Sequence, residues 1–402
     1  MRIRWRSPIR GPWLTSVLGL VLLCALPLVI VTGLLDWVAY GPGQTIPADV
    51  GALHLPLLGW PTRPSWLFRL TQGLHVGLGI VLVPVVLAKL WSVIPKLFTA
   101  LPRNPLRAAE RATLVLLVGG ILFEIVTGLL NIQYDYVFGF SFYAAHYTGA
   151  WVFTAGFVLH VALKLPAMTR GLRSRSFRTE LRTPLAQTRS EPPGDLVAPE
   201  PDPPTLSRRG ALALVAGGSL LLAGMTIGQT VDGPLRATAL LLPRGRTLPG
   251  DFPVNRTFAA SGVALAAVSA GWRLELGSLR LTREQLIALP QHTAALPIAC
   301  VEGWSTQQTW SGVRLHDLAA LAGVPAPTSA LVSSVEVGPF ARATLTGAQV
   351  RDPDALLALR VNGADLSPDH GFPARVIVPA LPGVHCTKWV RSIAFTTSGP
   401  RT

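Results

Sequence analysis

The sequence predicts a multi-domain protein, in which an all-α membrane bundle of five transmembrane helices is followed by an α+β domain. Half of the 402 residues are apolar and 14% are charged, whereas about 25% of an ordinary soluble domain is charged. Five segments of roughly 20 mostly apolar residues match the ~30 Å thickness of a hydrocarbon core. They cover residues 14–35, 66–90, 112–132, 143–165 and 210–230. The residues after 230 are numerous enough to form a domain with its own core.

These spans divide the chain into four predicted parts. They are a four-helix membrane domain (1–165), a disordered cytoplasmic linker (166–207), a fifth transmembrane helix (208–230) and an extracytoplasmic domain (231–402). The linker is predicted to be disordered because its proline-rich and acidic stretch from Glu191 to Pro204 has too few apolar residues for a core. The fifth helix begins with Arg208 and Arg209, which resemble a twin-arginine export signal. A plain positively charged membrane anchor is the alternative.

The basic residues alternate along the chain in a way that predicts its orientation. Lys and Arg gather before the first span, between the second and third, and between the fourth and fifth, while residues 36–65 and 133–142 contain only Arg63. Because Lys and Arg stay on the cytoplasmic side, we expect a multi-pass protein of the cell membrane. Its N-terminus is predicted to be cytoplasmic and its C-terminal domain extracytoplasmic. The net charge of +14 then reflects topology and attraction to the lipid bilayer, and no nucleic-acid partner is expected.

The region after the fifth span has the patterns of mixed α and β structure. Short β-branched and aromatic runs predict strands at residues 272–276, 331–337, 374–378 and 389–395. Residues 282–289 and 315–322 predict short helices, the first with Thr282 as its N-cap. The C-terminal domain is therefore predicted to be of the α+β class.

Three histidines lie inside the predicted spans, where polar side chains are costly and are candidates for function. His146 and His160 are 14 residues apart, so they face the same way about 21 Å apart along one helix. Counted from the outer surface, His75 lies closer in depth to His146 than to His160. His75 and His146 are therefore predicted to ligate one haem iron axially. His160 has no histidine partner at its own depth, so a second haem stays open, and an ordinary hydrogen-bonded role is the alternative for each.

This membrane unit resembles the four-helix cytochrome b subunits of bacterial respiratory enzymes, of the formate dehydrogenase gamma or cytochrome b561 type. The resemblance implies b-type haem and electron exchange with the quinone pool. The first span lacks a histidine, which departs from that pattern. Glu124, in the middle of the third span, is either a proton acceptor at a quinone site or the partner of a buried polar side chain.

Two cysteines lie in the C-terminal region, within Leu296-Pro-Ile-Ala-Cys-Val-Glu-Gly-Trp-Ser305 and Pro382-Gly-Val-His-Cys-Thr-Lys-Trp-Val390. In an extracytoplasmic domain, Cys300 and Cys386 are candidates for a disulfide. A thiolate ligand to a soft metal is the second interpretation. The sequence contains no Cys-x-x-Cys motif, so zinc is not supported.

The segment Cys300-Val-Glu-Gly-Trp-Ser305 and the later run from Val361 to Arg391 resemble the two cofactor-binding segments of the sulfite oxidase superfamily. This resemblance implies a sulfite-oxidase-like fold and a molybdopterin cofactor whose molybdenum is held by Cys300, with Glu302 and Trp304 in the same catalytic segment. The remaining candidates have chemical reasons as well: cations for the pterin phosphate, glycines for close backbone approach, and polar side chains for the pterin edge. They are Arg375 and Lys388, Gly371 and Gly383, and His370, Asn362 and Asn255. For each of these, an ordinary surface or turn role is the alternative.

The charge of the cysteine segment bears on the substrate. From Leu296 to Val313 there is no Lys or Arg, which favours a neutral substrate over a small anion such as sulfite. The superfamily's reductase branch, which repairs methionine sulfoxide, resembles the Cys-Val-Glu run more closely. We therefore predict a molybdopterin-dependent oxidoreductase that links the quinone pool, a b-type haem and an extracytoplasmic molybdenum site, and that reduces a small-molecule or protein S- or N-oxide. The alternatives are a sulfite dehydrogenase and a non-enzymatic, membrane-tethered binding or sensor module.

Overall fold

The protein is described by a computed structural model that covers residues 5–41, 59–97, 105–133, 140–241, 251–338 and 340–397. The chain forms two compact units. The first contains Met1–Val31, His75–Asn131 and Asp135–Met225, and the second contains Thr32–Leu74, Ile132–Tyr134 and Thr226–Thr402. The predicted boundary at residue 230 is therefore too simple, because the second unit includes the ends of four helices as well as the C-terminal sheets.

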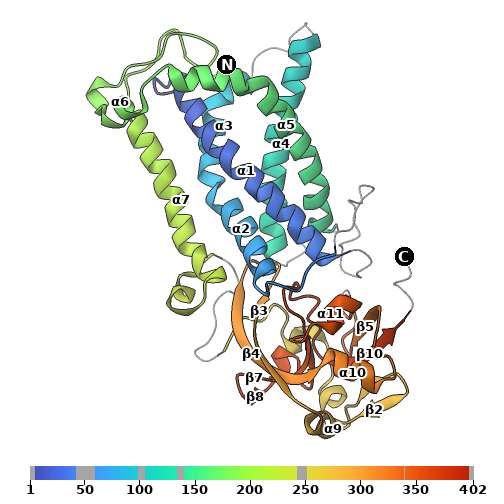
Figure 1. Ribbon diagram of the computed structural model, residues 1–402. Helices are drawn as coiled ribbons and strands as arrows, with labels where there is room; N and C mark the ends of the chain where they lie inside the picture. The colour runs from blue at the N-terminus through green and yellow to red at the C-terminus, as the bar shows by residue number, and fades with distance from the viewer. Residues whose placement is uncertain are drawn as a thin grey trace. The chain divides into compact units, whose positions relative to one another are not determined.

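Long apolar helices build the first unit (Figure 1). They are α1 (Pro12–Tyr40), α2 (Leu67–Val81), α3 (Val83–Leu97), α4 (Pro105–Gln133), α5 (Phe142–Arg173) and α7 (Arg208–Thr230). Trp13, Leu82 and Phe153 belong to one buried cluster, to which α4 and α7 add partly buried side chains. Within the described residues, α1, α4, α5 and α7 are long and apolar enough to cross a membrane, and the bent pair α2–α3 is a possible fifth span.

The predicted second span is broken in the structure. Helices α2 and α3 meet at Leu82 with a bend of 41°. Pro84 explains the break, because proline lacks the N–H that would bond back to Ile80 and its ring crowds the preceding turn. The span predicted from hydropathy as one helix is therefore two shorter helices.

Residues 166–207 differ from the predicted disordered linker. Helix α5 runs on to Arg173, and the short α6 (Phe177–Arg182) and η1 (Leu185–Gln187) follow. The physical reason is a buried ionic cluster. The Arg208 guanidinium, 1% exposed, lies 3.4 Å from Glu180 and 4.0 Å from Glu191, and Arg175 bonds Glu180 at 2.7 Å. These charges order a segment whose composition has too few apolar residues to do so.

Replacing Arg208 by methionine is expected to destabilise the first unit by at most about 3–5 kcal/mol, because the buried Glu180 and Glu191 would keep only the partly exposed Arg175 as a cation. Arg209 is exposed, so Arg209→Met is the matched control and should change stability little. Thermal unfolding of both variants in detergent checks this. Equal losses in the two variants would contradict the assignment of the effect to the buried ion pairs of Arg208, because Arg209 is exposed.

Two five-stranded sheets form the body of the second unit (Figure 1). One has the order β2-β1-β10-β5-β6; the other has the order β3-β4-β7-β8, with β9 paired to β7. Their strands are β1 (Leu274–Leu276), β2 (Leu279–Leu281), β3 (His292–Ala299), β4 (Ser305–Arg314), β5 (Ser329–Ser334), β6 (Arg342–Thr346), β7 (Leu356–Val361), β8 (Ala364–Asp365), β9 (Arg375–Ile377) and β10 (Val390–Thr396). All described pairings are antiparallel except β1 with β10.

Short helices cover the sheets. They are α8 (Phe258–Ser261), α9 (Arg283–Ala288), α10 (Leu315–Leu321) and α11 (Gly347–Arg351), with the 3-10 turns η2 (Gly233–Thr238), η3 (Leu265–Val268) and η4 (Pro368–His370). Thr282 caps α9 in a capping box with Gln285, as the pattern predicts. The α+β class and the predicted strands at β1, β5, β9 and β10 are confirmed.

Strands β3 and β4 were not predicted, although they form the long hairpin that carries Cys300 at its turn. Pro297 interrupts the first strand, and the run from Ser305 to Thr309 is polar, so neither segment shows the alternation of a half-buried strand. Their pairing with each other and with β7 forms them in spite of this local sequence.

Candidate functional site

Cys300 lies at the turn of the β3–β4 hairpin. Its N–H donates to Trp304 O at 2.9 Å, and its carbonyl accepts from Gly303 N at 3.0 Å. Gly303 has φ +88°, a left-handed conformation that glycine adopts without steric cost. The thiol is 2% exposed. All three cysteines of the chain are in the described part and none is in a disulfide, so the disulfide predicted as an alternative is not formed.

The loop between β9 and β10 packs against the cysteine turn. Gly383 N donates to Ala299 O at 2.8 Å, and a Cβ on Gly383 would lie 2.9 Å from that oxygen. Glycine is therefore required for this approach. The loop continues through His385, Cys386 and Thr387, all buried. Cys386 packs in the same hydrophobic cluster as Cys300, as a small apolar side chain does.

Arg375 is a buried cation at this site. Its Nε donates to Cys386 O at 3.1 Å and its Nη1 to His370 O at 3.4 Å. Burial lowers the pKa of the guanidinium to about 10, against an opposing effect of the two thiols of Cys386 and Cys300. Since the described residues offer it no carboxylate, Arg375 keeps N–H donors and positive charge for an anion.

Lys388 is the second cation, on the same loop. Its Nζ donates to Asp369 O at 3.0 Å and to Arg256 O. Gly371 has φ +108° and packs against the Lys388 side chain, since a Cβ on Gly371 would lie 3.1 Å from Lys388 Cβ. Burial, followed by the nearby charge of Arg375, lowers the pKa of Lys388 to about 7.

This pKa predicts how stability of the cofactor-free chain depends on pH. Because the folded pKa lies below the ordinary value of 10.5, the unfolded chain binds more protons between these values. Stability therefore rises with pH from 7 to 10.5, by at most about 1.4 kcal/mol per pH unit. The melting temperature of the cofactor-free full chain should rise over this range, and Lys388→Met should flatten the rise. An identical pH dependence in the two proteins would contradict this assignment.

His370 is buried beside the cations. Its Nε2 lies 2.6 Å from Asp251 Oδ1, and its ring stacks on Phe252 with centroids 3.6 Å apart. Desolvation lowers the pKa of the imidazole. Asn255 is close in sequence, and its Oδ1 accepts from Arg256 N at 2.9 Å. The structure thus brings His370 to the cluster and places Asn255 in the segment that lines it.

Glu302 and Trp304 lie in the cysteine turn, and both are buried. The Trp304 indole N–H donates to Glu302 Oε2 at 2.8 Å. This bond fixes the turn that holds Cys300, so the structure gives these two side chains a positioning role. Their predicted catalytic role stays a prediction.

Asn362 is the predicted residue that the structure does not bring to the cluster. It has φ +51° in the exposed turn between β7 and β8. Its amide pairs with β4, donating to Gln308 Oε1 at 2.6 Å and accepting from Thr309 N at 3.1 Å. Both ends of the side chain therefore serve the hairpin.

Helix ends of the second unit also hold the cysteine turn. Gln72 of α2 donates to Val301 O at 2.9 Å, and Thr230 of α7 donates to Gly303 O at 3.3 Å. Sequence reasoning missed these contacts, because nothing in the local sequence links the start of α2 to residues more than 200 positions later.

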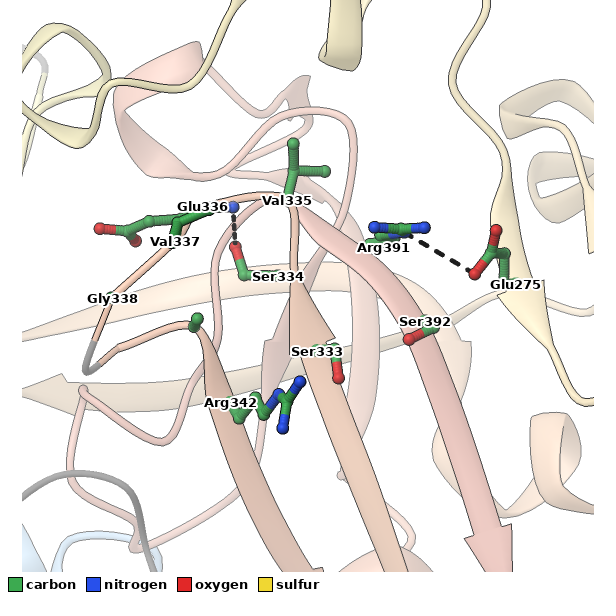
Figure 2. Close-up of a pocket in the computed structure, with 11 residues that line it drawn as sticks. Glu275, Ser333, Ser334, Val335, Glu336, Val337, Gly338, Arg342, Arg391 and Ser392 are labelled. Carbon is green, nitrogen blue, oxygen red and sulfur yellow. Dashed lines mark hydrogen bonds and ion pairs between the residues drawn. The ribbon is translucent and has the colours of Figure 1, made fainter.

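A separate hollow of about 590 Å³ lies at the other sheet. Figure 2 shows the Arg391 guanidinium facing the Glu275 carboxylate, 3.7 Å apart, and Ser334 Oγ accepting from Glu336 N at 3.0 Å. Its lining includes none of the predicted site residues. We therefore assign the candidate site to the buried cluster around Cys300.

Unpartnered buried atoms show that this cluster fits a bound polar group. Within the described chain, no hydrogen bond reaches the Thr387 hydroxyl, and none of good geometry reaches the ring nitrogens of His385, although the Tyr40 backbone acts on that ring. Buried polar atoms are seldom left in this state unless a ligand or water satisfies them. Together with the uncompensated Arg375, they match a ligand that has an anionic group and a polar ring system, as molybdopterin does. Sequence reasoning missed His385 and Thr387, although they lie within the run that it selected.

In the first unit, the structure brings His75 and His146 together. Their ring centroids are 6.0 Å apart with the planes at 84°. Two imidazoles that ligate one iron from opposite sides have centroids about 6 Å apart, because each nitrogen–metal bond is about 2 Å. The Nδ1 of His75 bonds Val29 O at 2.9 Å, and the Nδ1 of His146 lies 3.1 Å from Glu124 Oε2. Such bonds leave Nε2 as the nitrogen for a metal.

His160 is not part of this pair. It lies near Lys89, whose Nζ donates to Thr15 O at 2.6 Å. A cation at this depth is a poor neighbour for a second metal. More generally, among the residues with described placement, no three His, Cys, Asp or Glu side chains form a metal-binding group.

Comparison with known proteins adds independent information on the second unit. Residues 263–401 match the family described as the oxidoreductase molybdopterin binding domain. The chain is 32% identical over 161 residues to the oxidoreductase YuiH of Bacillus subtilis (strain 168), which spans 39% of this chain and 79% of that protein. It is 32% identical over 149 residues to a nitrate reductase [NADH] of Volvox carteri, covering 29% of this chain and 17% of that one. It is 36% identical over 111 residues to a sulfite oxidase of Arabidopsis thaliana, covering 23% and 28%.

Proposed function

Because this chain belongs to the family of oxidoreductases with a molybdopterin-binding domain, we propose that it is a membrane-anchored redox enzyme. It passes electrons between the quinone pool, a b-type haem on His75 and His146, and a molybdenum centre on Cys300. Its substrate is an S- or N-oxide, such as methionine sulfoxide in a protein. The enzyme class and the molybdopterin cofactor follow from the family. The membrane, the haem, the quinone and the substrate are parts of the proposal.

One observation carries the molybdenum site, namely the surroundings of Cys300. The thiol is buried outside any disulfide, and it interacts electrostatically with the buried cations Arg375 and Lys388. Nearby cations favour the thiolate, which is the form that ligates a metal. A thiolate ligand and an anionic cofactor would account for a buried thiol beside the Arg375 guanidinium, to which the described residues offer no carboxylate.

The chain's own residues then have definite tasks. When bound, molybdopterin supplies a metal that exchanges two electrons and one oxygen atom with a substrate. Arg375 and Lys388 would hold the pterin phosphate, while Gly371 lets Lys388 pack closely and Gly383 lets its loop approach the cysteine turn. His370 presents its imidazole to the same cluster and is oriented by Asp251. Most of the residues around the thiol are buried, which limits the access of water, although Val301 and Phe372 are partly exposed.

Support for the haem comes from the geometry of His75 and His146 given above. A haem carries one electron at a time, so it suits transfer between a two-electron quinol and a two-electron metal site. Glu124 Oε2 lies beside His146, and the other oxygen, Oε1, is buried without a hydrogen bond in the described chain. That free oxygen supports Glu124 as a group that binds a quinol hydroxyl. His160 is given a structural role.

The apolar helices and the distribution of basic residues support a location in the cell membrane. In this proposal the N-terminus faces the cytoplasm and the molybdopterin domain lies outside, with no role for nucleic acid. Arg208 has a structural role in the ionic cluster with Glu180 and Glu191. The twin-arginine export signal stays a prediction.

A second candidate substrate is sulfite. The cysteine hairpin from Leu296 to Val313 supplies no cation, which supports a neutral oxide. Arg375 and Lys388 nevertheless reach Cys300 electrostatically from other strands and loops. If they face the substrate instead of the pterin phosphate, a small anion would be favoured. Some relatives are themselves sulfite oxidases.

The test uses the purified full chain in detergent, produced in a host that makes molybdopterin. Its turnover is measured with methionine sulfoxide and a reduced quinol analogue, and separately with sulfite and an oxidant. We expect turnover with the sulfoxide, molybdenum near one per chain, and a b-type haem spectrum. Turnover with sulfite alone would overturn the substrate assignment, and the absence of haem would overturn the electron route.

A further inference from the structure

A row of buried polar side chains in the second unit leads away from the cofactor loop. His385, next to Cys386, is 2% exposed, and its ring nitrogens form no hydrogen bond of good geometry within the described chain, although the Tyr40 backbone lies close enough to act on the ring. Its ring meets that of Tyr40 of α1 edge-on, with centroids 5.9 Å apart and planes at 68°. The Tyr40 hydroxyl is itself buried. Two proton-carrying groups from distant parts of the sequence are thus adjacent and shielded from solvent.

Asp36 extends this row by one helical turn. It lies four residues before Tyr40 on α1, a spacing that puts both side chains on one face with Cβ atoms about 5–6 Å apart. Asp36 is buried, and its two carboxyl oxygens form no hydrogen bond of good geometry within the described chain. Thr71 of α2 lies beside it, but its hydroxyl donates to Phe68 O at 3.2 Å. No described cation pairs with Asp36, and a carboxyl group buried in this way is most stable with a proton on it.

The reaction at the cofactor site requires protons. Reduction of a sulfoxide follows R2SO + 2 H⁺ + 2 e⁻ → R2S + H2O, with the electrons supplied by a quinol. The opposite direction, SO3²⁻ + H2O → SO4²⁻ + 2 H⁺ + 2 e⁻, releases the same number of protons. Because the residues around Cys300 are buried, either reaction needs a path for protons through the protein.

We propose that Asp36, Tyr40 and His385 form a proton relay that serves the cofactor site, with Asp36 as the group that stores the proton. The proton passes from the carboxyl group of Asp36 through the Tyr40 hydroxyl to one nitrogen of His385, which releases a proton from its other nitrogen toward the site. Burial lowers the pKa of His385 to about 4, so the imidazole is neutral at pH 7 and does not trap the proton. A water molecule between Asp36 and Tyr40 would satisfy the free carboxyl oxygens. The inference rests on the proposed oxidoreductase function but holds for either direction.

The first test is turnover of the full-length holoenzyme with whichever substrate the unaltered chain turns over. Asp36→Asn, which cannot hold the proton, is expected to slow turnover about 100-fold, as loss of a proton-transfer group commonly does. Molybdenum content, the haem spectrum and KM should stay unchanged. Asp36→Glu should restore most of the rate, Tyr40→Phe and His385→Phe should slow it, and Asp195→Asn, which changes an exposed carboxylate, is the control.

The second test does not depend on activity. The infrared spectrum of the full chain should contain the C=O band of a protonated carboxylic acid, which shifts in D2O and is lost in Asp36→Asn but not in Asp195→Asn. Full turnover of Asp36→Asn, or an infrared spectrum that this change leaves intact, would overturn the relay. Loss of molybdenum or haem in Asp36→Asn would show a structural role and would also overturn it. If the unaltered chain turns over neither substrate, the proposed function fails instead, and the infrared band still decides whether Asp36 stores a proton.

Discussion

Replacing Cys300 by serine is expected to abolish turnover and leave the haem spectrum of the full chain unchanged. A serine hydroxyl is a far poorer ligand for a soft metal than a thiolate. Loss of an outer-shell partner already costs 10–100-fold in metal affinity or activity, so loss of the ligand itself should cost more than about 100-fold. Turnover with methionine sulfoxide and the visible spectrum, measured on the same preparation, check the two halves of this prediction.

Cys386→Ser is the matched control, because both cysteines are buried in the same hydrophobic cluster. Burial raises the pKa of the Cys386 thiol, although the nearby Arg375 opposes this effect, and Cys386 lies outside the turn that resembles the metal-binding segment. This variant should keep most of its molybdenum and turnover. Full activity in Cys300→Ser, or loss of metal only in Cys386→Ser, would show that the wrong cysteine is assigned to the metal.

Replacing His75 or His146 by alanine should remove the b-type haem spectrum while the molybdenum content stays near that of the unaltered chain. Each change removes one of the two nitrogens that would ligate the iron, and b-type haem has no covalent bond to the protein to retain it. We expect haem content to fall more than about tenfold in either variant, again because the loss exceeds that of an outer-shell partner. The ratio of haem absorbance to protein measures it.

His160→Ala is the control for this pair. His160 lies near Lys89 and away from the contact of His75 with His146, so this change should leave one haem per chain. A fall to half the haem content in His160→Ala would reveal a second haem. An unchanged spectrum in both His75→Ala and His146→Ala would reject the pair as ligands.

Much of the fold is readable from local sequence. The apolar helices follow from long runs of hydrophobic residues, and strands such as β10 follow from β-branched residues between turns. The pattern fails where distant segments decide the structure. The hairpin of β3 and β4 forms from strands that contain a proline and a polar run, because their pairing with β7 outweighs local preference. The segment before α7 is ordered by buried ion pairs of Arg208 with Glu180 and Glu191, which composition does not reveal.

Some residues of the candidate site could be predicted from the sequence, and others are identified only by the structure. Cys300, Arg375 and Lys388 were selected from the sequence, and the structure brings them to one buried cluster. Asn362 was selected too, but its amide is used within a hairpin turn. The sequence does not predict a role for His385, because a single histidine in a loop matches no motif. Only its burial and its contact with Tyr40 distinguish it.

By itself, the sequence determined the chemical groups that this chain can use and the order of its parts. Side-chain chemistry and hydrophobic length are local properties, which is why apolar spans, membrane histidines and a cysteine segment could be recognised one at a time. The depths of the histidines also predicted that His75 meets His146. Contacts with no such local signal were decided only by the tertiary structure, which places His385 against Tyr40 and Arg208 against Glu180 and Glu191. Burial and proximity arise from packing between segments that are far apart in the sequence. Burial changes the solvation and hydrogen bonding of an arginine, lysine or aspartate side chain, and the local sequence does not show which of these side chains are buried.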